Sequence, residues 1–318
     1  MQDLTPSVPS AVYLALGRVV MVAVTMKYEE KFIAFVDILG FASAVENAEG
    51  EGSLSLADLR DATKLLGSDS DVEAIRTDGP TICPCALRYA RDVGFELTQT
   101  SDCVIVSAEV SPSGAITIVN QCYLAVFRLL EKGLMCRGHV RRGKIFHRGH
   151  EFIGPGYQDA YRREGTVSAF KQDAEDRGTP FVELDPSIRD YVAECGDECV
   201  VEMYERMVRR DTEVDAIFPF KRLSSFITIG AEARLDVAKE KNSINNLRRM
   251  INKFRSGITR HVDTSNESAV RKFRHYESAL VAQLNECDRL DNMVDMLAAP
   301  YPSAGISNEN GGPTGRCS

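Results

Sequence analysis

The sequence of 318 residues has no tryptophan, five histidines and no repeated pair of cysteines. Cys83 and Cys85 are separated by one residue, whereas cysteine pairs that bind structural zinc are separated by two or more. The nine cysteines stand at irregular positions, which favours reduced, buried thiols in a cytoplasmic protein. His139, His147 and His150 are close in sequence, but their spacing fits no closed metal site.

The sequence also lacks a membrane-length apolar run, an internal repeat and an excess of positive charge. Residues 11–25 are strongly apolar, but Arg18 interrupts them and no basic segment precedes them, so we expect neither a membrane span nor a signal peptide. The formal net charge of -8 argues against general nucleic-acid binding by the whole molecule. We therefore expect no membrane and no nucleic-acid partner.

The composition present is ordinary for a folded protein, at 44% hydrophobic and 26% charged residues. We expect residues 1–28 to form an N-terminal extension and residues 29–222 to form the main folded domain. Residues 223–298 predict a helical region. The segment 299–318 is rich in Gly, Ser, Asn and Pro, which predicts a disordered tail.

Hydrophobic periodicity in the main domain predicts strands and helices in mixed order, which indicates an α+β fold with helices over one face of a sheet. Polar residues 67–79 predict a loop. The expected strands are 32–38 and 180–184, with hairpins at 95–107 and 134–147; the expected helices are 41–48, 54–66, 80–93, 114–132, 157–164, 187–194, 231–254 and 268–297.

Two carboxylates stand at the ends of apolar strand patterns. Asp37 ends the run Phe32-Ile-Ala-Phe-Val before Gly40, and Asp102 lies at the tip of the hairpin 95–107. If these strands pair side by side, the two acids come together, and such carboxylates suit Mg²⁺ or Mn²⁺ with nucleotide phosphates as further ligands. The alternative for Asp37 is a strand-end acid bonded to backbone amides.

A basic segment follows the main domain. Residues 239–274 contain ten Lys or Arg against three Asp or Glu. These side chains either neutralise phosphate or a neighbouring acidic subunit, or form a solvated helical face.

Four motifs, in this order, resemble the class III nucleotide cyclase homology domain, and within it the compact bacterial pyrimidine cyclases of the Pycsar antiphage defence system. The resemblance covers roughly residues 30–220 and implies a ferredoxin-like βαββαβ core with a C-terminal helical extension. The motifs are Phe35-Val-Asp-Ile-Leu-Gly-Phe41, Thr100-Ser-Asp-Cys103, Arg137-Gly-His-Val140 and Gly154-Pro-Gly-Tyr-Gln-Asp-Ala-Tyr-Arg162.

The resemblance implies a site for two divalent cations, Mn²⁺ or Mg²⁺. In that family the acid of the first strand and the acid of the hairpin bind both ions, and a main-chain carbonyl completes the site; here these residues are Asp37, Asp102 and Ile38. One ion would activate the ribose 3′ oxygen and the other would hold the triphosphate. The 3′ oxygen would then attack the α-phosphorus and pyrophosphate would leave.

Four further residues take their expected roles from the same resemblance. Gln158 and Arg162 occupy the positions of an Asn that orients the ribose and an Arg that contacts the reacting phosphate. Thr98 and Glu151 occupy the base-reading positions, and because they match neither purine pair of the family, they favour a pyrimidine. Arg137 either supports the triphosphate or pairs with an acid across strands.

The resemblance further implies a head-to-tail homodimer with composite active sites. The expected function is a metal-dependent cyclase that converts UTP, in preference to CTP, to the cyclic 3′,5′-monophosphate. The product would act on a cyclic-nucleotide-responsive effector in antiphage defence. Two alternatives are an adenylate or guanylate cyclase of the same fold and a non-catalytic nucleotide-binding signalling module.

Overall fold

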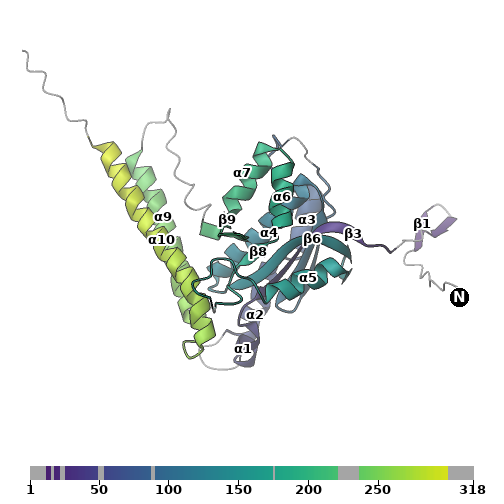
Figure 1. Ribbon diagram of the computed structural model, residues 1–318, viewed down its shortest axis with the longest axis horizontal. Coiled ribbons are helices and arrows are strands. Elements are labelled where there is room, and N and C mark those ends of the chain that lie inside the picture. Colours follow the sequence, from purple (N-terminus) through teal and green to yellow (C-terminus); the bar gives the residue numbers. More distant parts are fainter. Residues whose placement is uncertain are drawn as a thin grey trace, which may run out of the picture.

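The computed structural model describes residues 12–15, 18–21, 26–48, 54–86, 90–174, 176–220 and 236–299. An eight-stranded sheet lies at its centre, with helices around it and a long helical hairpin at one side (Figure 1). The strands are β1 (Val12–Ala15), β2 (Arg18–Met21), β3 (Glu29–Ile38), β4 (Glu96–Thr100), β5 (Cys103–Glu109), β6 (Cys136–Arg148), β7 (Glu151–Ile153), β8 (Val182–Leu184), β9 (Val208–Arg210) and β10 (Asp215–Ile217). The helices are α1 (Phe41–Glu46), α2 (Leu56–Thr63), the short 3-10 helix η1 (Lys64–Leu66), α3 (Asp69–Asp78), α4 (Pro112–Glu131), α5 (Pro155–Glu164), α6 (Pro186–Glu194), α7 (Glu198–Met207), α9 (Val237–His261) and α10 (Glu267–Ala298).

The sheet has the order β4-β5-β3-β6-β8-β10-β9, and β7 pairs with the end of β6. β3 lies between β5 and β6 and is antiparallel to both, whereas β6 and β8 are parallel. Along the chain, β3, helices, β4, β5, α4 and β6 follow one another in a βαββαβ order, so the predicted α+β class is confirmed. β1 and β2 pair with each other and are not part of this sheet.

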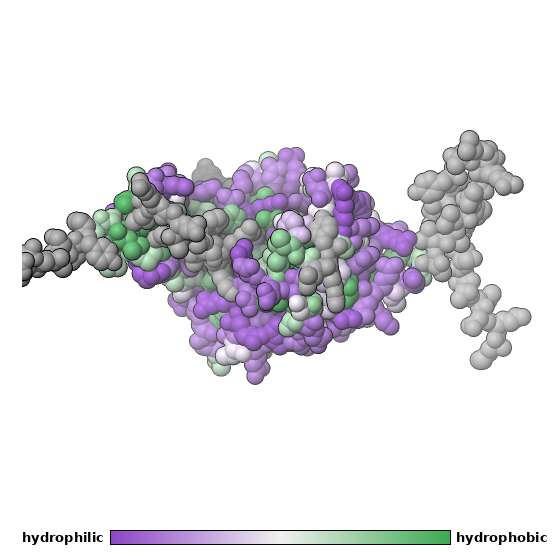
Figure 2. Space-filling view, turned by 90° about the horizontal axis from the view of Figure 1, so that it is seen from above, coloured by the Kyte–Doolittle hydropathy of each residue, from purple (hydrophilic) through white to green (hydrophobic). Residues whose placement is uncertain are grey.

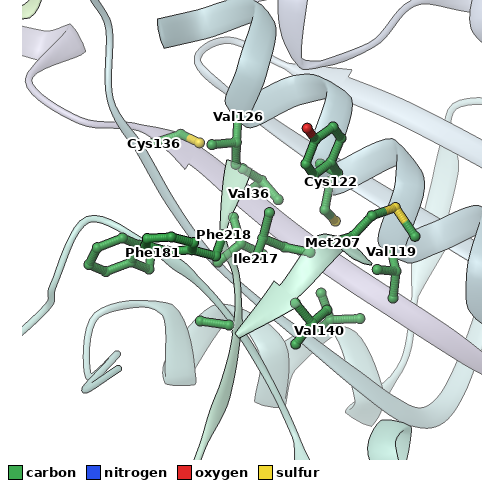
Figure 3. Close-up of a cluster of buried hydrophobic side chains, with 14 of the residues drawn as sticks. Val36, Val119, Cys122, Val126, Cys136, Val140, Phe181, Met207, Ile217 and Phe218 are labelled. Carbon is green, nitrogen blue, oxygen red and sulfur yellow. The ribbon is translucent and has the colours of Figure 1, made fainter. Parts of the chain in front are cut away.

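β3 is apolar on both of its faces, which explains its continuous hydrophobic run. Side chains alternate along a strand, so Phe32 and Val36 face one side and Ile33 and Phe35 the other. All four are buried, in two separate hydrophobic clusters. Figure 3 shows Val36 in the larger cluster, near side chains of α4 such as Val126.

The smaller cluster corrects the expectation that helices cover one face of the sheet. α5 packs on the second face, where its Ala160 lies against Ile33 and Phe35. The backbones of β6 and the start of α5 lie very close to each other, since a Cβ added to Gly143 of β6 would lie 2.9 Å from the Cα of Gly156. Both faces of the sheet are therefore covered, and β3 has no solvated side.

Two local predictions were wrong in the stretch between α2 and β4. Residues 69–78 form α3 instead of a loop, because Ser68 and Asp71 make a capping box at its start that outweighs its polar composition. The predicted helix 80–93 is absent from the residues described there, 80–86 and 90–93. Pro80 follows the end of α3, and a proline that follows a helix cannot continue it.

Two further differences lie after α4. The predicted hairpin 134–147 is the single strand β6, because its residues 136–145 pair continuously with β3 despite Gly138 and Gly143. The hairpin is instead formed by β6 and β7. The sequence did not predict α7, β9 or β10; of these, β10 and β9 extend the sheet beyond β8.

The predicted C-terminal helices are present as α9 and α10, which lie side by side as a hairpin (Figure 1). α10 is anchored to the sheet domain by Tyr276, which is 0% exposed and stacks on Phe181 at a ring distance of 5.4 Å. α9 approaches the end of α4 closely, since a Cβ on Gly133 would lie 2.3 Å from a backbone carbon of Gly257. The predicted disordered tail lies, apart from its first residue, outside the described residues.

The surface in Figure 2 is mostly hydrophilic over the sheet domain, with a hydrophobic area at the end of the helical hairpin. Met296 and Leu297 of α10 are among the exposed large hydrophobic side chains. In the described part of the chain, α4 is the one helix long and apolar enough to cross a membrane. Most of α4 is buried inside the protein, as expected of a core helix.

Replacing Tyr276 tests how far the helical hairpin stabilises the sheet domain. Tyr276→Ala should lower the free energy of unfolding by about 3–5 kcal/mol, because it leaves a cavity beside Phe181. Tyr276→Phe is the matched control: within the described residues the buried Tyr276 hydroxyl has no hydrogen-bond partner, so its loss should cost nothing. Urea unfolding followed by circular dichroism measures both, and equal loss in the two variants would contradict the packing argument.

Candidate functional site

Asp37 and Asp102 lie at neighbouring positions on the same edge of the sheet. Asp37 is the penultimate residue of β3, opposite Cys103 of β5, and Asp102 lies in the turn before Cys103. The backbone N–H of Ile38 donates to the carbonyl of Asp102 at 3.0 Å, which joins the two segments directly. Ser101 forms this tight turn with a φ of 54°. β-Pairing thus brings together two acids that are far apart in sequence.

The Asp37 side chain lies on the face of the sheet that α5 covers. Residues directly opposite each other in antiparallel strands share a face, so Asp37 has Cys103 on one side and Arg137 on the other. Arg137 forms an ion pair with Glu164 at the end of α5 and donates to the carbonyl of Gly178 at 3.3 Å. Of the two roles left open for Arg137, the structure shows pairing with an acid, which comes from a helix and not from a strand.

Charge around Asp37 is predominantly negative. Burial raises the pKa of Asp37 to about 7, and repulsion from Asp102 and Glu164 adds to the effect, while Arg137 and Lys272 oppose it. Burial and the same carboxylates raise the pKa of the Cys103 thiol to about 12, so Cys103 stays neutral. The cluster lacks enough positive charge to stabilise an ionised Asp37.

A divalent cation would supply that charge. The carboxylates of Asp37 and Asp102 and the main-chain carbonyl of Ile38 are hard oxygen ligands of the kind that Mg²⁺ and Mn²⁺ prefer. Across the described residues, no three His, Cys, Asp or Glu side chains converge as a complete metal site. The donor set fits a site in which phosphate oxygens of a ligand complete the coordination.

Gln158 and Arg162 are exposed on the outer side of α5. The Arg162 side chain is 70% exposed and forms an ion pair with Asp159 at 3.5 Å. Residues two apart on a helix do not share a face, so Arg162 points away from the side on which Glu164 meets Arg137. Within one chain, α5 therefore brings Glu164 to the acids and presents Gln158 and Arg162 to solvent.

Thr98 is buried, and its hydrogen bonds are used within the protein. Its hydroxyl donates to the carbonyl of Gly149 at 2.7 Å and lies 2.9 Å from Nε2 of His147. The ring nitrogen must then donate, so Nδ1 of His147 accepts a hydrogen bond from Ser107 at 2.9 Å. Burial lowers the pKa of His147 to about 4, which keeps the ring neutral. Glu151, the other expected base-reading residue, is exposed at the start of β7.

The sequence did not identify two charged residues near Asp37. Glu164 lies outside the resembling motifs, and Lys272 lies in α10, although the basic composition of residues 239–274 had pointed to that segment. Lys272 also lines a cavity of about 340 Å³ that Ile38 and Gly40 border. The helical hairpin thus reaches the edge of the sheet where the acids lie.

The chain matches no protein-family model and none of the curated proteins. Among the solved structures that are similar to this chain is a class III adenylyl cyclase-like ATP-binding protein from Pseudomonas aeruginosa, with 15% identity and a TM-score of 0.31 over 52% of this chain and 35% of that chain. This likeness is weak, spans about a third of that protein and assigns no family.

The pKa of Asp37 predicts a specific pH dependence of stability. Between the unfolded value of 3.8 and the folded value of about 7, the unfolded chain releases the proton while the folded chain keeps it. Stability from this group therefore falls as pH rises through that window. Asn does not titrate, so the Asp37→Asn variant does not lose stability in this way. The free energy of unfolding of the variant relative to wild type should therefore rise from about pH 4 to about pH 8. Urea unfolding across this range without metal measures the difference, and a constant difference would contradict the prediction.

Proposed function

We propose that the protein is a metal-dependent nucleotide cyclase that acts on a pyrimidine triphosphate, UTP in preference to CTP. The observation that supports it is the proximity of Asp37 and Asp102 at the ends of β3 and β5, where burial and repulsion from Asp102 raise the pKa of Asp37 to about 7. Carboxylates that are held close together and partly buried, at a cost in free energy, are characteristic of cation sites. The resemblance in the sequence motifs supplies the reaction and the pyrimidine preference.

In the proposed reaction the ribose 3′ oxygen attacks the α-phosphorus, the bond to the β-phosphate oxygen breaks, and pyrophosphate leaves with that electron pair. Bound Mg²⁺ or Mn²⁺ would lower the barrier by stabilising charge on both oxygens. Asp37, Asp102 and the carbonyl of Ile38 hold the cations, and the proton of the 3′ hydroxyl passes to solvent. Ion pairing with Glu164 fixes Arg137 beside Asp37.

Gln158 and Arg162 fit this scheme as residues that serve a second subunit. Both are exposed, and Arg162 faces away from the acids of its own chain. In a head-to-tail homodimer, Arg162 of the partner subunit would neutralise the reacting phosphate and Gln158 of the partner subunit would orient the ribose. Each of the two sites would then need residues from both chains.

The pyrimidine preference rests on the sequence resemblance alone, in which Thr98 and Glu151 match neither purine pair. In the structure the Thr98 hydroxyl donates to the carbonyl of Gly149, so it does not itself read the base. The product, a cyclic pyrimidine monophosphate, would act as a second messenger for an effector in antiphage defence. An adenylate or guanylate cyclase is the alternative within the same class.

A non-catalytic nucleotide-binding module is the second candidate function. The ion pair between Arg137 and Glu164 and the outward direction of Arg162 favour it, because neither of these two arginines of one chain is free to contact a phosphate at the acids of that chain. Such a module would bind nucleotide without releasing pyrophosphate, which separates it from the cyclase.

The proposed activity predicts a product that can be identified directly. Purified protein incubated with Mn²⁺ and each of ATP, GTP, CTP and UTP should form cyclic UMP, and less cyclic CMP, as measured by mass spectrometry. Asp37→Asn and Asp102→Asn should each lower the rate more than about a hundredfold, because each removes a direct metal ligand. Asp190→Asn, an exposed acid on α6, is the control and should keep full activity. Purine product, or nucleotide binding without any product, would reject the pyrimidine cyclase.

The composite site predicts complementation between two inactive variants. Asp37→Ala and Arg162→Ala, each inactive alone, form heterodimers with one intact site when they are mixed. An equal mixture should regain about one quarter of wild-type activity, since half of the dimers are mixed and each has one working site of two. Activity that stays absent after subunit exchange, confirmed by native mass spectrometry, would contradict a shared site.

A further inference from the structure

A cavity of about 340 Å³ lies where the end of β3 and the start of α1 meet the connection between α9 and α10. Figure 1 shows this end of the helical hairpin close to α1, on the side of the domain where β3 ends. Ile38, the expected carbonyl ligand, borders the cavity on the sheet side. From the hairpin side, the titratable residues that line it are Arg260, His261, Asp263 and Lys272.

The charged groups in the cavity are mainly cationic. Within the described residues, neither Lys272 nor Arg260 takes part in an ion pair. The carboxylate of Asp263 accepts hydrogen bonds from the N–H and the hydroxyl of Ser265 at 2.9 and 2.6 Å, so the adjacent turn engages it. His261 is the remaining titratable group, and burial lowers its pKa, which favours the neutral ring.

Lys272 lines this cavity and is close enough to the acidic cluster for their charges to interact. Its charge interacts favourably with Asp37 and Glu164 and unfavourably with Arg137. Burial lowers the pKa of Lys272, and the residue is half-buried where α10 meets the sheet edge. Lys272 makes no direct ion pair within the described residues and lines the cavity as a half-buried cation, which points to an anionic ligand there.

The position of Lys272 is fixed by the packing of α10. Tyr276 lies one helical turn further along the same face, fully buried, with its ring 5.4 Å from Phe181 and 6.1 Å from Phe220. On α9, Gly257 packs directly against Gly133 one turn before Arg260. Lys272 and Arg260 therefore lie on helices that pack against the sheet domain and not on a free tail.

We propose that Lys272, together with Arg260, binds the polyphosphate part of the nucleotide whose metal ions Asp37 and Asp102 hold. The C-terminal helical hairpin is then a part of the substrate site supplied by the same chain. This inference rests on the proposed function and adds a substrate-binding contact to it. An ammonium group suits a phosphate chain because it donates hydrogen bonds in several directions.

Tripolyphosphate tests the inference without any nucleotide chemistry. Isothermal titration calorimetry of the full-length protein with tripolyphosphate in EDTA should show binding to wild type. Lys272→Met keeps the length of the apolar stem, and it should raise the dissociation constant about tenfold, as expected for the loss of one charged contact. Lys272→Arg should retain binding. Lys239→Met, the same change at an exposed position of α9, is the matched control and should bind as wild type does.

The outcomes separate this inference from the proposed function. If wild type and Lys272→Met bind tripolyphosphate equally, or if wild type does not bind it, the inference is wrong, and Lys272 serves only as an internal counter-ion of the acids. Cyclase activity of Lys272→Met with an unchanged KM for UTP would overturn the inference and leave the proposed function standing. Lys272-dependent binding of tripolyphosphate by a protein that forms no cyclic product would support the anion site and reject the cyclase.

Discussion

The register of β3 between β5 and β6 is the constraint on which the candidate site depends. Alternate side chains of β3 fill two hydrophobic clusters, so a shift by one residue would move each of them to the wrong face. The same register places Asp37 opposite Cys103 and Arg137 and directs its carboxylate to the face that α5 covers. Burial of apolar side chains along the strand therefore also places the acid at its end.

An imbalance of charge connects this sheet edge with the C-terminal helices. Asp102 and Glu164 lie close enough to Asp37 for their charges to repel it, and Arg137 forms an ion pair with Glu164. Such a cluster is expensive to bury unless cations join it. Lys272 of α10 supplies a positive charge that interacts favourably with Asp37 and Glu164. Because Lys272 also lines the neighbouring cavity, the same ammonium group can attract an anionic ligand there.

The two faces of α5 have different surroundings, because residues four apart share a face of a helix. Ala160 and Glu164, four residues apart, face the sheet, whereas Gln158 and Arg162, also four apart, face solvent. A motif that is contiguous in sequence is thus split in space. Under the proposed function this geometry explains why the acids of one subunit would need the outer face of α5 from another.

The sequence alone determined the features that follow from local periodicity and chain order. It predicted the strand that carries Asp37 near its end, the hairpin with Asp102 at its tip and the long helices α4 and α10, because each has a strong apolar pattern. It failed at α3, where a capping box stabilised a polar helix. Only the tertiary structure decided that Thr98 bonds to Gly149 and His147, that Glu164 holds Arg137 and that Lys272 approaches Asp37. These contacts join residues that are distant in sequence, and the direction in which a side chain points depends on how whole elements pack.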